Sequence, residues 1–529
     1  MSKILEPEII WSMIRKKCEG NSFKIAMFTF GFSIIVYIQM ITEWLANPDA
    51  NGLLLYKRSN EWENTLGRVG LGMFIKLKGN FQFPTLQTIF CVFVLAIITV
   101  LLCVIFDICQ PMWGLMFGGL MVCSPFICDL LTYYYTADAY MVAYLFSVLF
   151  VYMLIKYRNI WAFITAVILL TCSLGLYQAF LGTSITLCLL YLLYRLLKKG
   201  DSRKTILLQG GRFLAGGCSG TILYLLAYRF YCSWKNIQPT EARGFASMGT
   251  IPKERIGELI KEAYIYFTDY YFTDNLIYNS WHLWKYCNIL VFLSIAAIMT
   301  ILLWKKQREI QSILLTFIGL IILPLSFMSI VVMAPGASIT ESTGILMLPH
   351  MNFIYLFLIA LVAGDSDGIA AIVWGKWITA ALSSYLIFIL LLYVQIFQNC
   401  MRMELNRNYA LAQRIVIQVE AMPEYHQGMK LMICGEAENG NYPRSYQDWY
   451  GVVKGTVAEY GGFWDNADGR QSSWIGFFNN YLGLSYSRCS VEDITAVTSS
   501  EEYKKMPIFP EQGSVIMIDD CAVVKLSPE

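Results

Sequence analysis

The sequence predicts a polytopic α-helical membrane protein with a small α/β domain at its C-terminal end. Of the 529 residues, 57% are hydrophobic and 15% are charged, a balance far more apolar than that of soluble domains. Apolar runs of about 20 residues, the length that crosses the hydrocarbon core as a helix, recur between residues 23 and 398. The segment after residue 399 is instead polar and rich in Gly, Asn, Ser and Asp.

Run length predicts about eleven membrane spans. The first run is too long for the apolar core of a signal peptide and lacks a small-residue cleavage site, so we expect an uncleaved anchor. The tenth run is the shortest. The expected spans are 23–42, 85–106, 111–131, 139–155, 160–175, 179–197, 206–231, 287–304, 311–332, 350–363 and 376–398.

Lysine and arginine clusters set the expected orientation, because basic loops stay on the cytoplasmic side. The clusters fall on alternate loops, at 15–17, 156–158, 195–204 and 305–308. We therefore expect a transmembrane domain over 1–398 and an extracytoplasmic domain over 399–529, so that most polar residues lie outside. The outer loops of the first domain are expected at 43–84, 232–286 and 333–349.

The C-terminal segment carries the pattern of a small α/β domain. Its short apolar runs are 430–434, 514–518 and 522–526. The last two flank Asp519 and Asp520 and predict a hairpin, while 401–420 and 490–505 have a helical pattern.

Several function classes lack support in the sequence. The net charge of +2 predicts neither a nucleic-acid partner nor an acidic substrate. There is no G-x-x-x-x-G-K-[ST], G-x-G-x-x-G or H-E-x-x-H motif. The 15 cysteines are mostly single and lie mostly in apolar runs, so no metal and no redox cofactor is expected.

The first outer loop predicts a helix lying in the membrane interface. Its apolar residues recur at helical spacing, at Trp62, Leu66, Val69, Met73 and Leu77. If it is helical, Glu61 and Arg68 lie on nearly the same side, about 10 Å apart by the helical rise. An acid and a guanidinium would then face one cavity; the alternative is a solvated juxtamembrane helix with snorkelling charges.

A carboxylate at the border of the fourth span is the second candidate. Asp138 follows three consecutive tyrosines, 133–135, in the stretch YYYTADAYMV. An ionisable group at the end of a span is costly unless it is paired or faces water, so Asp138 is a functional candidate. The alternative is an N-cap of the fourth span, and the two roles are compatible.

Two further features lie on the expected outer side. In SLGLYQAFLG, Tyr177 and Gln178 interrupt a long apolar stretch. Two interpretations of Gln178 are open: it forms an interhelical hydrogen bond, or it contacts the substrate. The segment 264–286 is dense in aromatic residues. It fits an interfacial aromatic belt or a sugar-binding platform.

Together these motifs resemble the bacterial membrane glucosyltransferase family of the GtrII type. The segments that carry the resemblance are EWENTLGR, YTADAYMVAYLFSVLFVYML, SLGLYQAFL and the C-terminal KKMPIFPEQGSVIMIDDCAVVKLS. Two positions depart from the family pattern: Ser59 stands where an acidic residue precedes the tryptophan by three, and Val69 stands where an aromatic residue commonly follows Gly-Arg. The first departure leaves Asp49 and Glu61 as rivals for the catalytic base.

The resemblance implies a GT-C-like polytopic fold in the bacterial cytoplasmic membrane. Such an enzyme moves a glucosyl or related hexosyl residue from undecaprenyl-phosphate sugar to a cell-surface polysaccharide on the outer face. The implied catalytic groups are Glu61 or Asp49 as base and Asp138 as an orienting group or alternate base. For this chemistry we expect Arg68 or His350 to bind the phosphate, and we expect further substrate contacts from Trp62, Tyr135, Tyr177 and Gln178.

Two other classes remain open from the sequence. A transporter or flippase needs ionisable or broken helices at mid-membrane and an inverted repeat, whereas the charges here lie mainly at span ends. A non-catalytic scaffold that presents the C-terminal domain does not need carboxylates gathered on one face.

Overall fold

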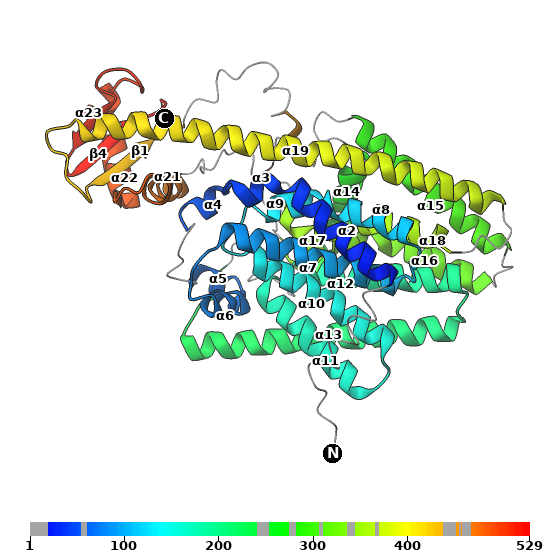
Figure 1. Cartoon of the computed structure of the whole chain (residues 1–529). Helices are drawn as coiled ribbons and strands as arrows, with labels where there is room; N and C mark the ends of the chain where they lie inside the picture. Colours follow the sequence, from blue (N-terminus) through cyan, green and yellow to red (C-terminus); the bar gives the residue numbers. More distant parts are fainter. Residues whose placement is uncertain are drawn as a thin grey trace, which may run out of the picture.

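Long apolar helices lie side by side in one bundle in the computed structural model of the chain (Figure 1). The structure describes residues 20–53, 61–240, 253–273, 282–305, 310–335, 344–364, 370–436, 451–453, 456 and 467–528. Among these residues, seven helical stretches are long and apolar enough to cross a membrane. They are α7 (Pro84–Ile105), α10 (Ala137–Lys156), α12 (Phe180–Tyr194) with η1 (Arg195–Lys199), α13 (Arg203–Lys235), α15 (His282–Lys305), α16 (Ile310–Phe327) and α19 (Ala370–Glu420).

The other expected spans correspond to shorter apolar helices. These are α2 (Asn21–Val36), α8 (Pro111–Val122), α11 (Ile160–Leu176) and α18 (Phe353–Val362). Short helices connect or extend them: α3 (Ile38–Thr42), α4 (Pro48–Asn51), α5 (Glu61–Thr65), α6 (Val69–Leu77), α9 (Pro125–Leu130), η3 (Lys253–Arg255), α17 (Ser329–Met333) and η4 (Gly344–Met347). A further helix of 17 residues is α14 (Ile256–Phe272). A polytopic helical membrane protein is therefore confirmed, whereas the count of eleven spans and the GT-C-like class stay predictions.

Proline explains where several helices begin. Pro84, Pro111 and Pro125 stand in the first turns of α7, α8 and α9, where the missing N–H costs nothing. Pro125 also divides the run 111–131 into two helices, because proline cannot continue the hydrogen-bond ladder of α8.

The bundle packs around α10, which contacts α7, α11 and α12. The aromatic segment near 264–272 belongs to this core. Phe267, Tyr270 and Tyr271 lie on one face of α14 and are buried, with Phe267 and Tyr271 in edge contact with Phe292 and Phe327. These three rings form neither an exposed belt nor a sugar platform, because spacing at i, i+3 and i+4 turns them toward the bundle. Residues 274–281 lie outside the described residues.

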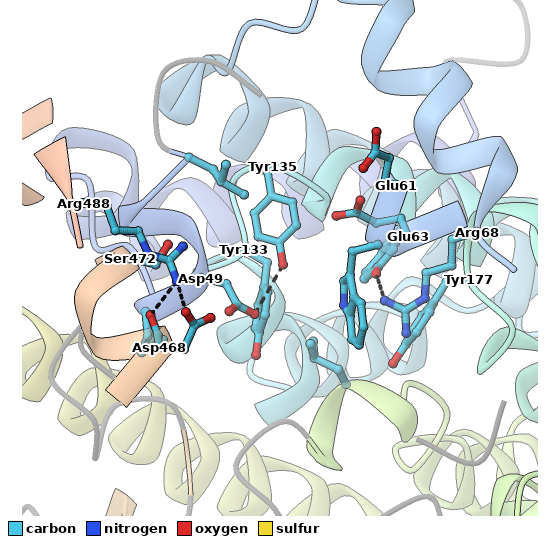
Figure 2. Close-up of a pocket in the computed structure, with 16 residues that line it drawn as sticks. Asp49, Glu61, Glu63, Arg68, Tyr133, Tyr135, Tyr177, Asp468, Ser472 and Arg488 are labelled. Atoms are coloured by element: carbon cyan, nitrogen blue, oxygen red, sulfur yellow. Dashed lines mark hydrogen bonds and ion pairs between the residues drawn. The ribbon is translucent and has the colours of Figure 1, made fainter. Parts of the chain in front are cut away.

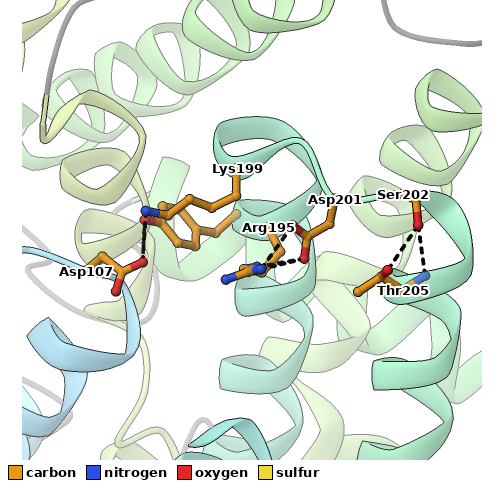
Figure 3. A network of polar contacts seen from close by, with 7 residues as sticks. Asp107, Arg195, Lys199, Asp201, Ser202 and Thr205 are labelled. Carbon is orange, nitrogen blue, oxygen red and sulfur yellow. Dashed lines mark hydrogen bonds and ion pairs between the residues drawn. The ribbon is translucent and has the colours of Figure 1, made fainter.

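A polar network joins the helices at the end of the bundle opposite α5 and α6 (Figures 1 and 3). Lys199 Nζ lies 3.0 Å from an Asp107 carboxylate oxygen. Arg195 donates two hydrogen bonds to Asp201, at 2.8 and 3.0 Å. Gly200, with φ of 79°, reverses the chain between η1 and α13. This is the basic loop that the sequence assigns to the cytoplasm, an orientation that stays a prediction.

The C-terminal segment holds a four-stranded sheet of order β2-β1-β4-β3. Its elements are β1 (Lys430–Cys434), α21 (Ala467–Tyr481), β2 (Ser487–Arg488), α22 (Val491–Ser499), α23 (Glu501–Lys505), β3 (Val515–Ile518) and β4 (Cys521–Lys525). Strand β1 pairs in parallel with β2 and β4, and β3 with β4 forms the antiparallel hairpin expected around Asp519 and Asp520. The end of α19 and α21 cover one face of the sheet, and α22 and α23 cover the other.

Helix α19 links the bundle to this sheet. It continues without a break across residue 399, where the sequence predicts a new domain, and its 51 residues reach about 75 Å. Ala412, Ile415 and Val419 near its end are fully buried against the sheet. The division into two domains at this position stays a prediction.

Candidate active site

The segment 61–77 is broken into two short helices. α5 ends at Thr65 and α6 begins at Val69, so the prediction of one continuous interfacial helix is wrong. Gly67 has φ of 76°, in the left-handed region that ends helices, and this is the physical reason for the break. The break leaves Arg68 at the start of α6.

Arg68 lies against two tyrosine rings. Its Nη1 donates to the Tyr140 hydroxyl at 2.9 Å, and its guanidinium carbon lies 4.6 Å from the centre of the Tyr177 ring. The two rings stack on each other with centroids 4.3 Å apart. Burial by itself lowers the pKa of Arg68, but the facing tyrosines and the Glu63 carboxylate outweigh it and raise this pKa. The guanidinium therefore stays cationic.

One side chain from the turn between α11 and α12 and one from α13 hold the turn at Gly67. Gln178 Nε2 donates to the Leu66 carbonyl and to the Tyr224 hydroxyl, both at 2.8 Å, and Tyr224 donates to the Gly67 carbonyl at 3.1 Å. Gln178 is buried behind the turn. Its bond to Tyr224 of α13 is the hydrogen bond between helical segments that the sequence offers as one interpretation. A contact between Gln178 and substrate stays a prediction.

A close backbone contact fixes α6 on α11. A Cβ atom placed on Gly70 would lie 2.9 Å from the carbonyl carbon and oxygen of Gly175. This separation is too short for any side chain at position 70, so Gly70 allows α6 to approach the backbone of α11 closely. Gly175 lies just before Tyr177, so the contact also places the ring beneath Arg68.

The broken segment forms one wall of a cavity of about 560 Å³ (Figure 2). Four carboxylates and two guanidinium groups line it, together with several tyrosines. Its lining residues are Pro48, Asp49, Leu53, Glu61, Trp62, Glu63, Arg68, Tyr133, Tyr135, Tyr140, Tyr177, Leu346, Asp468, Gly469, Ser472 and Arg488. Six of the nine candidates from the sequence are therefore brought together: Asp49, Glu61, Trp62, Arg68, Tyr135 and Tyr177.

Three carboxylates of the cavity come from the segment between α3 and α7. Asp49 lies in α4, whose N-cap Asn47 accepts a hydrogen bond from the Ala50 N–H, and the Tyr135 hydroxyl donates to Asp49 at 3.4 Å. Glu61 is exposed, whereas Glu63 is 6% exposed. Sequence reasoning missed Glu63, although it stands in the same EWENT segment. Both rivals for the base, Asp49 and Glu61, line the cavity.

The structure places Asp138 and His350 away from the cavity lining. Asp138 lies in the first turn of α10, two residues after the N-cap position at Thr136, and its carboxylate is 2.7 Å from Lys78 Nζ. Its side chain is 5% exposed, so this is a nearly buried ion pair between α10 and the end of α6. His350 is buried, and its ring Nε2 donates to the Phe327 carbonyl at 2.9 Å. The catalytic and binding roles expected of these two residues stay predictions.

Comparison with known proteins gives one family match. The model of the family described as glucosyl transferase GtrII matches residues 39–361, which include all lining residues that precede the C-terminal segment. No curated protein and no solved structure matches the chain. The family match confirms the resemblance that the sequence motifs indicate.

We expect Gly70→Ala to reduce glycosyl transfer by about tenfold or more. The added methyl group cannot fit against the Gly175 backbone, so α6 and Arg68 must shift, and shifts of about 1 Å at a reacting centre are costly. Gly217→Ala in α13 is the matched control, because no atom lies within 4 Å of its added Cβ. Initial rates in membranes measure both variants; equal activity of the two would contradict a positioning role for this contact.

We expect Lys78→Met and Asp138→Asn each to cost about 3 kcal/mol of stability, because each leaves a poorly solvated charge without its partner. The double variant leaves no unpaired charge and should recover most of the loss. Thermal unfolding in detergent measures the cycle. If Asp138 orients α6 through Lys78, transfer activity returns with stability in the double variant, whereas a stable but inactive double variant assigns Asp138 to the chemistry.

Proposed function

Because the chain belongs to the GtrII glucosyl transferase family, we propose that it transfers a glucosyl or related hexosyl residue from undecaprenyl-phosphate sugar to a cell-surface polysaccharide. The reaction takes place on the outer face of the bacterial cytoplasmic membrane. The family supports a membrane glycosyltransferase, and the cavity at the α5–α6 break supports this donor.

The observation that supports this donor most directly is that Arg68 is a cation whose hydrogen-bond partner is neutral. Among the described residues, its side chain donates to a neutral hydroxyl rather than to a carboxylate. Its Nε atom is buried and has no hydrogen-bond partner within the described parts of the chain. A guanidinium that lines the cavity and has no carboxylate hydrogen-bond partner among the described residues fits a phosphate oxygen, which arginine binds by charge-assisted hydrogen bonds. Arg68 is thus a better candidate for the phosphate than His350, whose ring bonds a carbonyl in the core.

The surroundings of Arg68 fit a donor with a lipid tail. Trp62, Met73 and Leu77 on α5 and α6 are 56%, 66% and 85% exposed. Large apolar side chains exposed beside a charged cavity suit an element at the membrane border. A polyprenyl chain can then remain in the bilayer along these side chains while its phosphate reaches Arg68.

The lining residues suffice for the transfer step. An acceptor hydroxyl oxygen attacks the anomeric carbon of the donor sugar, and the bond from that carbon to the phosphate oxygen breaks. The electron pair leaves on the polyprenyl phosphate, whose charge Arg68 stabilises. Asp49 or Glu61 takes the proton of the acceptor hydroxyl.

We expect transfer in proteoliposomes to require a polyprenyl-phosphate sugar as donor. Radiolabelled glucose on that lipid should appear in polysaccharide, whereas a nucleotide sugar without lipid carrier should give none, because the cavity binds a lipid phosphate beside the bilayer. Transfer from a nucleotide sugar by the purified protein alone would refute this donor assignment.

We expect one of Asp49→Asn and Glu61→Gln to lower the turnover number by about 100-fold or more, the scale of a lost general base. The change keeps size and hydrogen bonding but removes the carboxylate charge, so KM for the donor should stay near wild type. Glu63→Gln tests the buried neighbour in the same assay. Near-normal turnover in both the Asp49 and the Glu61 variants would exclude both rivals as the base.

A further inference from the structure

Part of the cavity wall lies outside the region that matches the family. The family model ends at residue 361, but Asp468, Ser472 and Arg488 also line the cavity. In Figure 2 these residues lie on one side, Arg68 and Tyr177 lie on the other, and Asp49 lies between the two sides. The C-terminal segment therefore completes a cavity that the transmembrane bundle leaves open.

The contact between α21 and α4 fixes this wall. A Cβ on Gly476 would lie 2.3 Å from Gly52 Cα, so the two backbones meet without side chains between them. Asn480 Nδ2 donates to the Asn51 carbonyl at 3.0 Å, and the Tyr481 hydroxyl donates to the Trp44 carbonyl at 3.0 Å. Because Asp49 belongs to α4, these bonds set its position relative to α21.

The side chains on this wall form a neutral polar group. Arg488 Nη2 donates to the Asp468 carboxylate and, at 3.2 Å, to the Asp468 carbonyl. The two side chains are 42% and 61% exposed, so both retain sides that face the cavity and solvent. Because Asp468 compensates its charge, Arg488 differs from Arg68, which has a neutral hydroxyl partner.

The different partners of Arg68 and Arg488 favour different ligands. A phosphate favours the cation without a carboxylate partner, on the Arg68 side. A guanidinium beside a carboxylate, with the Ser472 hydroxyl nearby, offers paired donors and acceptors for the hydroxyl groups of a neutral sugar. The two guanidinium groups thus differ in their hydrogen-bond partners, as the two substrates of a glycosyl transfer differ in charge.

We propose that Asp468, Ser472 and Arg488 form the acceptor subsite and bind hydroxyl groups of a neutral sugar unit in the acceptor polysaccharide. This inference rests on the proposed glycosyl transfer. A sugar held on this wall presents a hydroxyl toward Asp49, while the anomeric carbon of the donor approaches from the Arg68 side.

The test separates acceptor binding from donor chemistry. The donor is radiolabelled glucose on undecaprenyl phosphate, and the acceptor probe is surface polysaccharide from the source bacterium after deletion of the gene. Transfer is measured against the concentration of each substrate, and the release of free glucose to water is measured without acceptor. The variants are Arg488→Gln, Asp468→Asn and Ser472→Ala; the control is Glu501→Gln, which removes another exposed ion pair of the C-terminal segment.

We expect Arg488→Gln and Asp468→Asn to raise KM for the polysaccharide by about tenfold or more, with a smaller rise for Ser472→Ala. KM for the donor and the rate of glucose release to water should stay within about twofold of wild type, as should every parameter of Glu501→Gln. Exposed ion pairs contribute little to stability, so the variants should fold, and thermal unfolding checks this.

Two results would overturn the acceptor subsite. One is an unchanged KM for the polysaccharide in folded Arg488 and Asp468 variants. The other is an equal loss of glucose release to water, which would place these residues in the donor chemistry. A wild-type protein that neither transfers glucose nor releases it from the lipid would contradict the proposed function itself, and the subsite with it.

Discussion

The turn at Gly67 depends on two hydrogen-bond donors that reach it from distant parts of the bundle, the α11–α12 turn and α13. A chain that leaves helical geometry beside a bilayer exposes backbone carbonyls that water or side chains must satisfy. Gln178 and Tyr224 donate to the Leu66 and Gly67 carbonyls, so this break is stable where it stands. The position of Arg68, and with it the wall of the cavity, follows from that arrangement.

The cations near this cavity differ in whether a carboxylate is their hydrogen-bond partner. Lys78 is paired with Asp138, and Arg488 with Asp468, so each pair is close to neutral. Among the described residues, Arg68 contacts tyrosine rings and a hydroxyl, and Glu63 acts on it through its charge and not through a hydrogen bond, so its remaining N–H groups stay available to an anion. A binding site for a phosphate needs this second kind of environment, because a bound carboxylate would compete with the ligand.

Much of the helical architecture could be predicted from the sequence, because the length and apolar composition of a run are enough to indicate a membrane-spanning helix. The hairpin around Asp519 and Asp520 could also be predicted, because the turn and the two strands that it joins are adjacent in the sequence. The break at Gly67 was missed because the apolar spacing of Trp62, Leu66 and Val69 fits one helix, and the donors that favour a turn stand more than 100 residues away. Lys78 could not be predicted as the partner of Asp138 for the same reason, because 60 residues separate the two.

The C-terminal wall was the least predictable part of the site, and the reason is geometric. Gly52 and Gly476 are separated by more than 400 residues, and neither has a side chain that could signal a contact. The segment is attached at two points, through the end of α19 behind the sheet and through α21 on α4. One attachment would leave the sheet free to pivot about the bundle. Two attachments, through two different helices, fix the separation between Arg488 and the α4 carboxylate, which a site that must align two substrates requires.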